Sequence, residues 1–114
     1  MPYLAITTNV PLAAECESAL AAEISKILGE QLKKPQSFVM VSVQPVRVLR
    51  FAGSEEPAAF LDLKSIGLPN DLSDISLALT QTVGRHTGIP ASRVFIAFAD
   101  ISPSRWAHEG DTYS

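Results

Sequence analysis

A repeat with an offset of 55 residues constrains the fold more than any other feature of the sequence. Gly29 and Pro35 align with Gly84 and Pro90, within the segments LAAEISKILGEQLKKP and ISLALTQTVGRHTGIP. The apolar residues before the two glycines recur every four positions, which places them on one side of a helix. They are Leu20, Ile24 and Leu28 in the first copy, and Ile75, Leu79 and Val83 in the second. Because only two copies fit in 114 residues, the repeat predicts a duplicated unit and not a solenoid.

Each copy is typical of a strand, a helix and a second strand. The predicted order is strand 2–8, helix 12–32, strand 38–44, then strand 58–66, helix 72–87 and strand 93–101. Asn70 and Asp71 are start signals for the second helix, and Gly88 with Pro90 marks its end. Right-handed crossovers place both helices on the same face of the sheet. We therefore predict an α+β fold in a single domain, 1–114. It consists of two βαβ pseudo-repeats, at 2–50 and 57–101, that share a four-stranded mixed sheet with both helices on one face.

The other face of this sheet is predicted to lack charge. Side chains alternate along a strand, so Val94, Ile96 and Phe98 point to one face and Phe95, Ala97 and Ala99 to the other. The neighbouring positions on that second face are small or weakly polar, namely Tyr3, Ala5, Met40 and Ser42. Such a face is typical of one that packs against another subunit, which predicts a closed homo-oligomer. The alternative is that the C-terminal segment SPSRWAHEGDTYS folds back over the sheet of its own chain.

Composition and charge exclude several kinds of partner. A formal charge of -3 offers no basic surface for phosphates, so no nucleic-acid partner is expected. One cysteine, Cys16, and two histidines are too few for a structural metal site. The sequence has no long apolar span and no signal peptide, so no membrane partner is expected. The expected location is the cytoplasm, with secretion that uses no signal peptide left open.

Pro2 has two interpretations. Proline is tolerated at the first position of a strand, where no ladder hydrogen bond is lost. Alternatively, removal of Met1 would convert the non-basic amide nitrogen of Pro2 into a secondary amine. An apolar pocket with a nearby cation would lower the pKa of that amine and give a neutral base near pH 7. From its position alone, Pro2 does not distinguish the two.

The cation is expected in the turn that contains Lys33, Lys34 and Pro35. Lysines at the end of a helix also complement its dipole while remaining solvated, and the local sequence does not separate Lys33 from Lys34. Lys34, next to Pro35, is the better candidate for an anion clamp. The stretch from Lys64 to Gly67 either exposes backbone groups of Ser65 and Ile66 to a site or is an ordinary strand exit.

Four segments together resemble the macrophage migration inhibitory factor family and its D-dopachrome tautomerase relatives. They are MPYLAITTNVP, the KKP turn, FAGSEEPAAFLDLKSIG and RVFIAFADISPSRWAHEGDTYS, and the similarity covers essentially the whole chain. The resemblance implies the tautomerase superfamily fold and a homotrimer in which three sheets form a barrel. It also implies active sites between neighbouring subunits and no cofactor.

The resemblance implies a role for each candidate residue. Pro2 would be the catalytic base in the keto-enol tautomerisation of a 2-oxo acid such as phenylpyruvate, and Lys34 would hold the substrate carboxylate. The remaining substrate contacts would be Ser65, Ile66 and Tyr3, with Phe95 and Ala97 from the adjacent subunit. Mammalian members commonly have a tyrosine and an asparagine at these last two positions, so two polar contacts are missing.

The family also implies an alternative function, that of a cytokine-like binding or signalling homotrimer whose pocket is incidental. Its protein receptor would be unknown. Some members carry a Cys-x-x-Cys pair where this chain reads Ala58, Ala59, Phe60 and Leu61. A thiol oxidoreductase activity based on that motif is therefore not expected.

Overall fold

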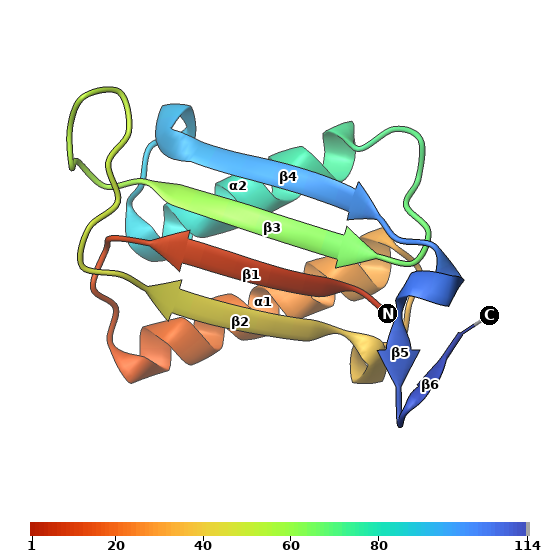
Figure 1. The fold of residues 1–114 in the computed structure, drawn as a ribbon. Coiled ribbons are helices and arrows are strands. Elements are labelled where there is room, and N and C mark those ends of the chain that lie inside the picture. Colours follow the sequence, from red (N-terminus) through yellow and green to blue (C-terminus); the bar gives the residue numbers. More distant parts are fainter. Residues whose placement is uncertain (114) are drawn as a thin grey trace.

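Two βαβ units meet in the middle of one mixed sheet in the computed structural model, which describes residues 1–113 (Figure 1). The strand order is β2-β1-β3-β4, with β1 and β2 parallel, β3 and β4 parallel, and β1 and β3 antiparallel. The strands are β1 (Tyr3–Thr8), β2 (Met40–Pro45), β3 (Ala59–Ser65) and β4 (Val94–Asp100). Helix α1 (Ala14–Gln31) joins β1 to β2, and α2 (Ser73–Thr87) joins β3 to β4. Both helices cover the same face, which confirms the predicted fold class. The sheet of the single chain is open, with β2 and β4 at its edges.

The helix starts differ slightly from the sequence prediction. Helix α1 begins at Ala14 and not at 12, whereas α2 begins one residue after the predicted 72. Leu72 is the residue before α2, and Asp71 supports the helix start by accepting a hydrogen bond from the Ser73 amide at 2.9 Å. Hydrogen bonding from Ser73, first from its side chain and then from its amide, lowers the pKa of Asp71. Neither helix of residues 1–113 is long and apolar enough to cross a membrane.

The helix ends follow the repeat closely. Gly88 ends α2 in the left-handed conformation, with a φ of 77°, as its sequence position predicts. After each helix a proline, Pro35 or Pro90, precedes a short 3-10 turn that leads into the next strand. The turn after the helix therefore has the same form in both βαβ units, as the helix and the strands do.

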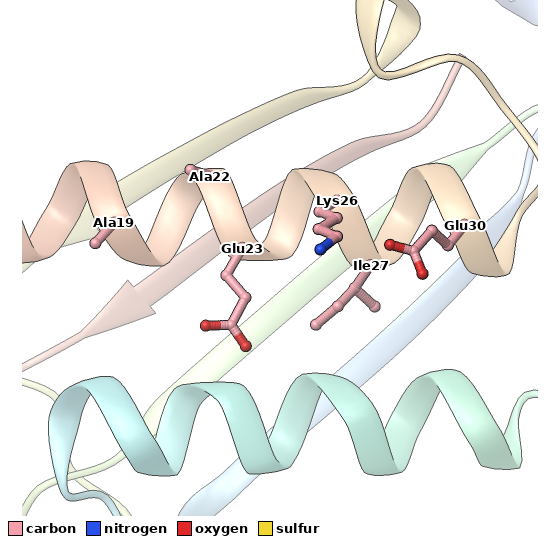
Figure 2. A pocket seen from close by; sticks show the side chains of 6 residues that line it. All are labelled: Ala19, Ala22, Glu23, Lys26, Ile27 and Glu30. Carbon is pink, nitrogen blue, oxygen red and sulfur yellow. The ribbon is translucent and has the colours of Figure 1, made fainter.

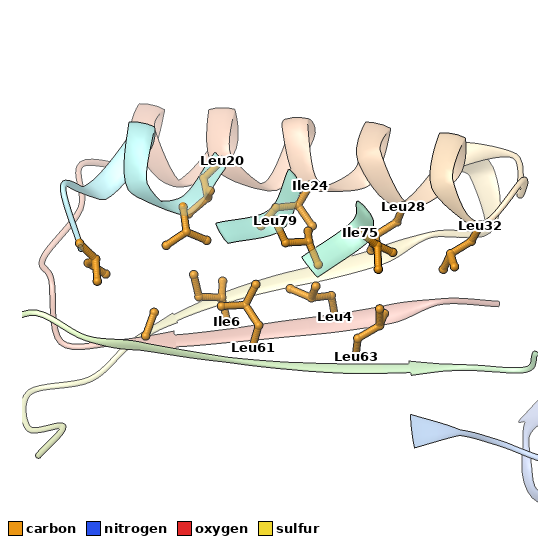
Figure 3. Close-up of a cluster of buried hydrophobic side chains, with 13 residues drawn as sticks. Leu4, Ile6, Leu20, Ile24, Leu28, Leu32, Leu61, Leu63, Ile75 and Leu79 are labelled. Atoms are coloured by element: carbon orange, nitrogen blue, oxygen red, sulfur yellow. The ribbon is translucent and has the colours of Figure 1, made fainter. Parts of the chain in front are cut away.

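The hydrophobic core lies between the helices and the sheet (Figure 3). The apolar positions of the sequence repeat all point into it and are at most 3% exposed. Inward-facing residues of β1 and β3 meet them from the sheet. The core contains Leu4, Ile6, Leu61 and Leu63 from the strands, Leu20, Ile24 and Leu28 from α1, and Ile75, Leu79 and Val83 from α2.

The face without helices differs from the prediction, because it carries a charged pair. The register of β1 and β3 places Asp62 opposite Ala5 and Lys64 opposite Tyr3. Their charged atoms lie 3.9 Å apart, and each side chain is nearly half exposed. The prediction of an uncharged face was wrong, because it considered only strands whose outward residues are small or apolar. Phe95 on β4 is exposed, as predicted.

The motif FAGSEEP has a structural explanation in the loop between β2 and β3. The Asn9 side chain donates to the carbonyls of Leu49, Glu55 and Glu56, and its Oδ1 accepts from the Ala58 amide. Arg93, directly before β4, donates from its guanidinium to the carbonyls of Pro57, Phe51 and Glu56. Two polar side chains thus satisfy the backbone of an otherwise irregular segment.

The C-terminal segment forms a small hairpin that the sequence analysis did not predict. Strands β5 (Ala107–His108) and β6 (Asp111–Thr112) are joined by Glu109 and Gly110, both at positive φ. The hairpin lies beyond the end of the sheet, near the N-terminus (Figure 1). Phe60 and Phe95 remain 45% and 43% exposed, so the described part of this segment does not cover the centre of the open face. It borders only one end of that face, beside Tyr3, Met40 and Lys64.

Candidate functional site

Pro2 is fixed immediately before β1. Its ring is fully buried, and its carbonyl accepts a hydrogen bond from the Met40 amide at 3.0 Å. This bond extends the pairing of β1 with β2 by one position. The start of the chain is held in one place although it lies at a terminus.

The α-amino group at this end lies in an environment that disfavours positive charge. Burial, and to a smaller extent the nearby Lys34 ammonium, lower the pKa of the Met1 amine below its usual 8.0. Both causes act against the protonated form of an amine.

A cavity of about 410 Å³ opens beside this terminus. Its lining is mostly apolar and comes from the chain start, the turn after α1, the end of β3 and the C-terminal segment. The lining residues are Met1, Lys34, Pro35, Phe38, Ile66, Pro103 and Tyr113. An apolar cavity with a single lysine among its side chains can bind a small organic anion.

The turn after α1 separates the two lysines that the sequence left unresolved. Lys33 takes the left-handed conformation, with a φ of 55°, and its side chain is exposed. Lys34 is half-buried and lines the cavity, while its amide donates to the Gly29 carbonyl at 2.9 Å. The geometry therefore favours Lys34 over Lys33 as the residue that faces a ligand in this cavity.

Of the other predicted substrate contacts, some line this cavity and some do not. Ile66 lines the cavity. The Ser65 side chain is fully buried, and its carbonyl accepts from the Ile101 amide at 2.8 Å. Phe95 and Ala97 lie on the open face of β4 and do not line this cavity; Phe95 packs instead against Phe51, with ring centroids 4.8 Å apart. Roles for Ser65, Phe95 and Ala97 in ligand binding stay predictions.

Sequence reasoning missed three residues that line the cavity, namely Phe38, Pro103 and Tyr113. Phe38 is the first residue of the predicted strand 38–44, and Tyr113 lies well beyond the last predicted strand, so no sequence signal placed either of them at the site. Tyr113 reaches the cavity because its amide donates to the carbonyls of Pro103 and Trp106, both at 3.2 Å. These long-range bonds cannot be read from residue spacing.

A second cavity, of about 650 Å³, lies next to the first on the open face of the sheet. Its lining includes Tyr3, whose hydroxyl shares a hydrogen bond of 3.1 Å with Ser42. It also contains two cationic side chains. The lining residues are Tyr3, Met40, Lys64, Ile101, Arg105, Trp106 and Ala107.

A hollow of about 710 Å³ lies beside α1 and is lined by residues of that helix. Glu23 and Ile27 reach from α1 toward α2 (Figure 2). Glu23 accepts hydrogen bonds from Arg85 and Thr82 and bonds to His86 Nε2 at 2.8 Å. Hydrogen bonds from Arg85 first, and then His86, lower the pKa of Glu23 to about 2. This network ties the two helices together. Among residues 1–113, no cluster of three or more His, Cys, Asp and Glu side chains is arranged to hold a metal ion.

Comparison with known proteins gives a consistent result. The family model of macrophage migration inhibitory factor matches residues 1–114. A macrophage migration inhibitory factor homologue from Brugia malayi is 36% identical over 115 residues, which cover 99% of each chain. A homologue from Trichinella spiralis is 33% identical, with 99% of this chain and 100% of the relative covered.

Solved structures agree with the sequence relatives. A macrophage migration inhibitory factor-like protein from Entamoeba histolytica superposes with a TM-score of 0.93 at 26% identity, covering 98% of both chains. A homologue from Prochlorococcus marinus gives a TM-score of 0.92 at 32% identity, covering 98% of this chain and 99% of the other. Sequence and fold agree over nearly the full length, and the chain belongs to the macrophage migration inhibitory factor family.

Proposed function

We propose that this protein is a cofactor-independent keto-enol tautomerase for phenylpyruvate-like 2-oxo acids, with Pro2 as general base and acid after removal of Met1. The observation that supports this most strongly is the environment of the chain start. Burial first, and the nearby Lys34 ammonium second, lower the pKa of the Met1 amine, which lies beside an apolar cavity. The same two causes would act on a prolyl amine at that end of the chain.

The proposed reaction needs only this chain's residues and water. The neutral Pro2 nitrogen removes a proton from the carbon next to the 2-oxo group. The C–H electron pair becomes the C=C bond, and the carbonyl oxygen takes a proton from water to give the enol. The hydroxide that this leaves takes the proton from the prolyl ammonium, which restores the neutral base and the water. The reverse sequence returns the keto form, with the prolyl ammonium as the acid. Lys34 binds the carboxylate, and Ile66 and Phe38 provide apolar walls.

We also propose that the protein acts in the cytoplasm as a homotrimer in which a neighbouring subunit contributes Phe95 and Ala97 near the site. The open face supports an assembly because it exposes Phe60, Phe95 and Met40. Apolar groups gathered on one face are typical of a protein interface. Sedimentation analysis should give the mass of three chains, and a monomeric mass would contradict the assembly.

The tautomerase proposal is tested with intact mass and ultraviolet absorbance of phenylpyruvate. Pro2→Gly keeps an amine but loses the ring, and kcat should fall about a hundredfold or more. Lys34→Ala should raise KM about tenfold, because it removes a charge-assisted hydrogen bond. Lys33→Ala is the matched control, since that side chain is exposed outside the cavity, and its KM should stay within about twofold.

Two results would contradict the proposal. One is active protein that retains Met1, because its Pro2 nitrogen is a non-basic amide. The other is equal activity of Pro2→Gly, Lys34→Ala and the wild type. A processed chain without turnover would favour the alternative of a cytokine-like binding trimer.

A further inference from the structure

We propose that the second cavity is an anion subsite, and that the preferred substrates are 2-oxo acids with a second acidic group at the end remote from the 2-oxo carboxylate. This inference rests on the proposed function, which it deepens by naming the substrate class. Its central residues are Lys64 and Arg105, neither of which the tautomerase chemistry uses.

The two cavities are lined by neighbouring positions of the same four segments. Four segments contribute one residue to each cavity, and the two residues are always two positions apart. The pairs, first cavity before second, are Met1 and Tyr3, Phe38 and Met40, Ile66 and Lys64, and Pro103 and Arg105. Two residues of an extended chain span roughly 7 Å, whereas Pro103 and Arg105 lie within the more compact 3-10 turn Pro103–Arg105. A ligand whose carboxylate lies at Lys34 can therefore extend its other end into the second cavity.

The cations of the second cavity are available to a ligand. The Lys64 ammonium lies 3.9 Å from Asp62, and both side chains are nearly half exposed, so this pair is weak. No acidic side chain pairs with Arg105 within residues 1–113. The Arg105 amide is held by the Ser102 carbonyl at 2.9 Å, which fixes the backbone that carries the guanidinium.

The chemistry of the lining matches an aromatic or other apolar body that ends in an anion. Trp106, Ile101 and Met40 provide apolar surface, and the two cations lie at the same cavity. The chain as a whole carries a formal charge of -3. Cationic side chains gathered around one strand end, on a protein of net negative charge, create a local field that attracts anions.

The test compares two substrates of the same shape. (4-Carboxyphenyl)pyruvate carries the second negative charge, whereas (4-carbamoylphenyl)pyruvate does not. Wild-type protein should show a kcat/KM ratio of carboxylate to carboxamide that is about tenfold higher than that of Lys64→Gln/Arg105→Gln. Lys26→Gln on the outer side of α1 makes a charge change of the same sign away from both cavities, and should keep the wild-type ratio.

A ratio within twofold of the wild type in the double variant would overturn the subsite, while turnover of both substrates would leave the tautomerase proposal intact. A loss of the oligomeric mass in that variant, with no change in the ratio, would also overturn it and assign the two cations to a subunit interface. If neither substrate turns over, calorimetry that compares the binding of terephthalate with that of its monoamide tests whether the subsite exists. Tighter binding of terephthalate, lost in the double variant, supports the subsite although the tautomerase proposal fails. Equal binding of the two overturns it.

Discussion

Gly29→Ala tests whether the last turns of α1 position Lys34. The repeat aligns Gly29 with Gly84, and both lie within helices, but their surroundings differ. A Cβ on Gly29 would lie 3.1 Å from the Lys34 carbonyl oxygen and 3.2 Å from Gln36 Cγ. A Cβ on Gly84 would meet the Ile89 carbonyl oxygen at 3.5 Å, which is ordinary van der Waals contact. Gly84→Ala is therefore a matched control in the second copy of the repeat.

Gly84→Ala should raise the free energy of unfolding, whereas Gly29→Ala should lower it. Alanine in place of glycine within a helix stabilises the fold by about 0.5–1 kcal/mol. Gly84→Ala should show this gain, with a Tm increase of about 2–4 °C for a chain of this size. At Gly29 the contact with the Lys34 carbonyl adds an overpacking cost of about 1–3 kcal/mol. The side chain of Gln36 can move, whereas that carbonyl belongs to backbone held by the bond from the Lys34 amide to the Gly29 carbonyl.

The assay is urea unfolding at equal chain concentration, combined with phenylpyruvate kinetics. Gly29→Ala should be less stable than the wild type by about 1 kcal/mol, and should raise KM more than it lowers kcat, because the change displaces the carboxylate clamp and not the base. Equal stabilisation by both substitutions would refute the reasoning, since it would mean that the backbone at Lys34 can move away from the new Cβ without loss of stability. An unchanged KM in a destabilised Gly29→Ala would refute the link between this turn and the site.

Two further predictions concern stability. Thr8→Val removes a buried hydroxyl that donates to the Ala58 carbonyl at 2.8 Å, and should lower the unfolding free energy by about 1–3 kcal/mol. The buried hydroxyl of Ser65 has no partner within residues 1–113, so Ser65→Ala should cost less than about 0.5 kcal/mol or stabilise the protein. Equal losses of the two variants in urea unfolding would contradict this prediction. The pKa of Glu23 is lowered from its ordinary 4.5 to about 2, so its contribution to stability is complete above pH 4.5 and is lost as the pH falls toward 2. Glu23→Gln should therefore weaken the dependence of unfolding free energy on pH in that window, and an unchanged slope would contradict the role of the Arg85 contact.

The sequence alone determined the two helices, the four strands of the main sheet and their buried faces. The four-residue apolar spacing before Gly29 and Gly84 and the two-residue spacing after Pro35 and Pro90 predicted both helices and the strands that follow them. These periods reflect local geometry, because each residue's direction depends on its position in the helix or strand that contains it. The helix end at Gly88 was equally predictable, since the left-handed conformation there favours glycine. Pro2 and Lys34 were identified as candidates for the same kind of reason, from residue type and position next to predicted elements.

Only the tertiary structure decided how the two units join and which side chains meet. The antiparallel pairing of β1 with β3 placed Lys64 beside Tyr3 and Asp62 beside Ala5, and this register depends on contacts between segments about sixty residues apart. The left-handed backbone at Lys33 turned Lys34 toward the cavity, and the hairpin near residue 110 brought Tyr113 to the chain start. Apolar periodicity indicates which face of a helix or strand is buried. It carries no information on which element lies opposite, because pairing is set by the packing of the whole core.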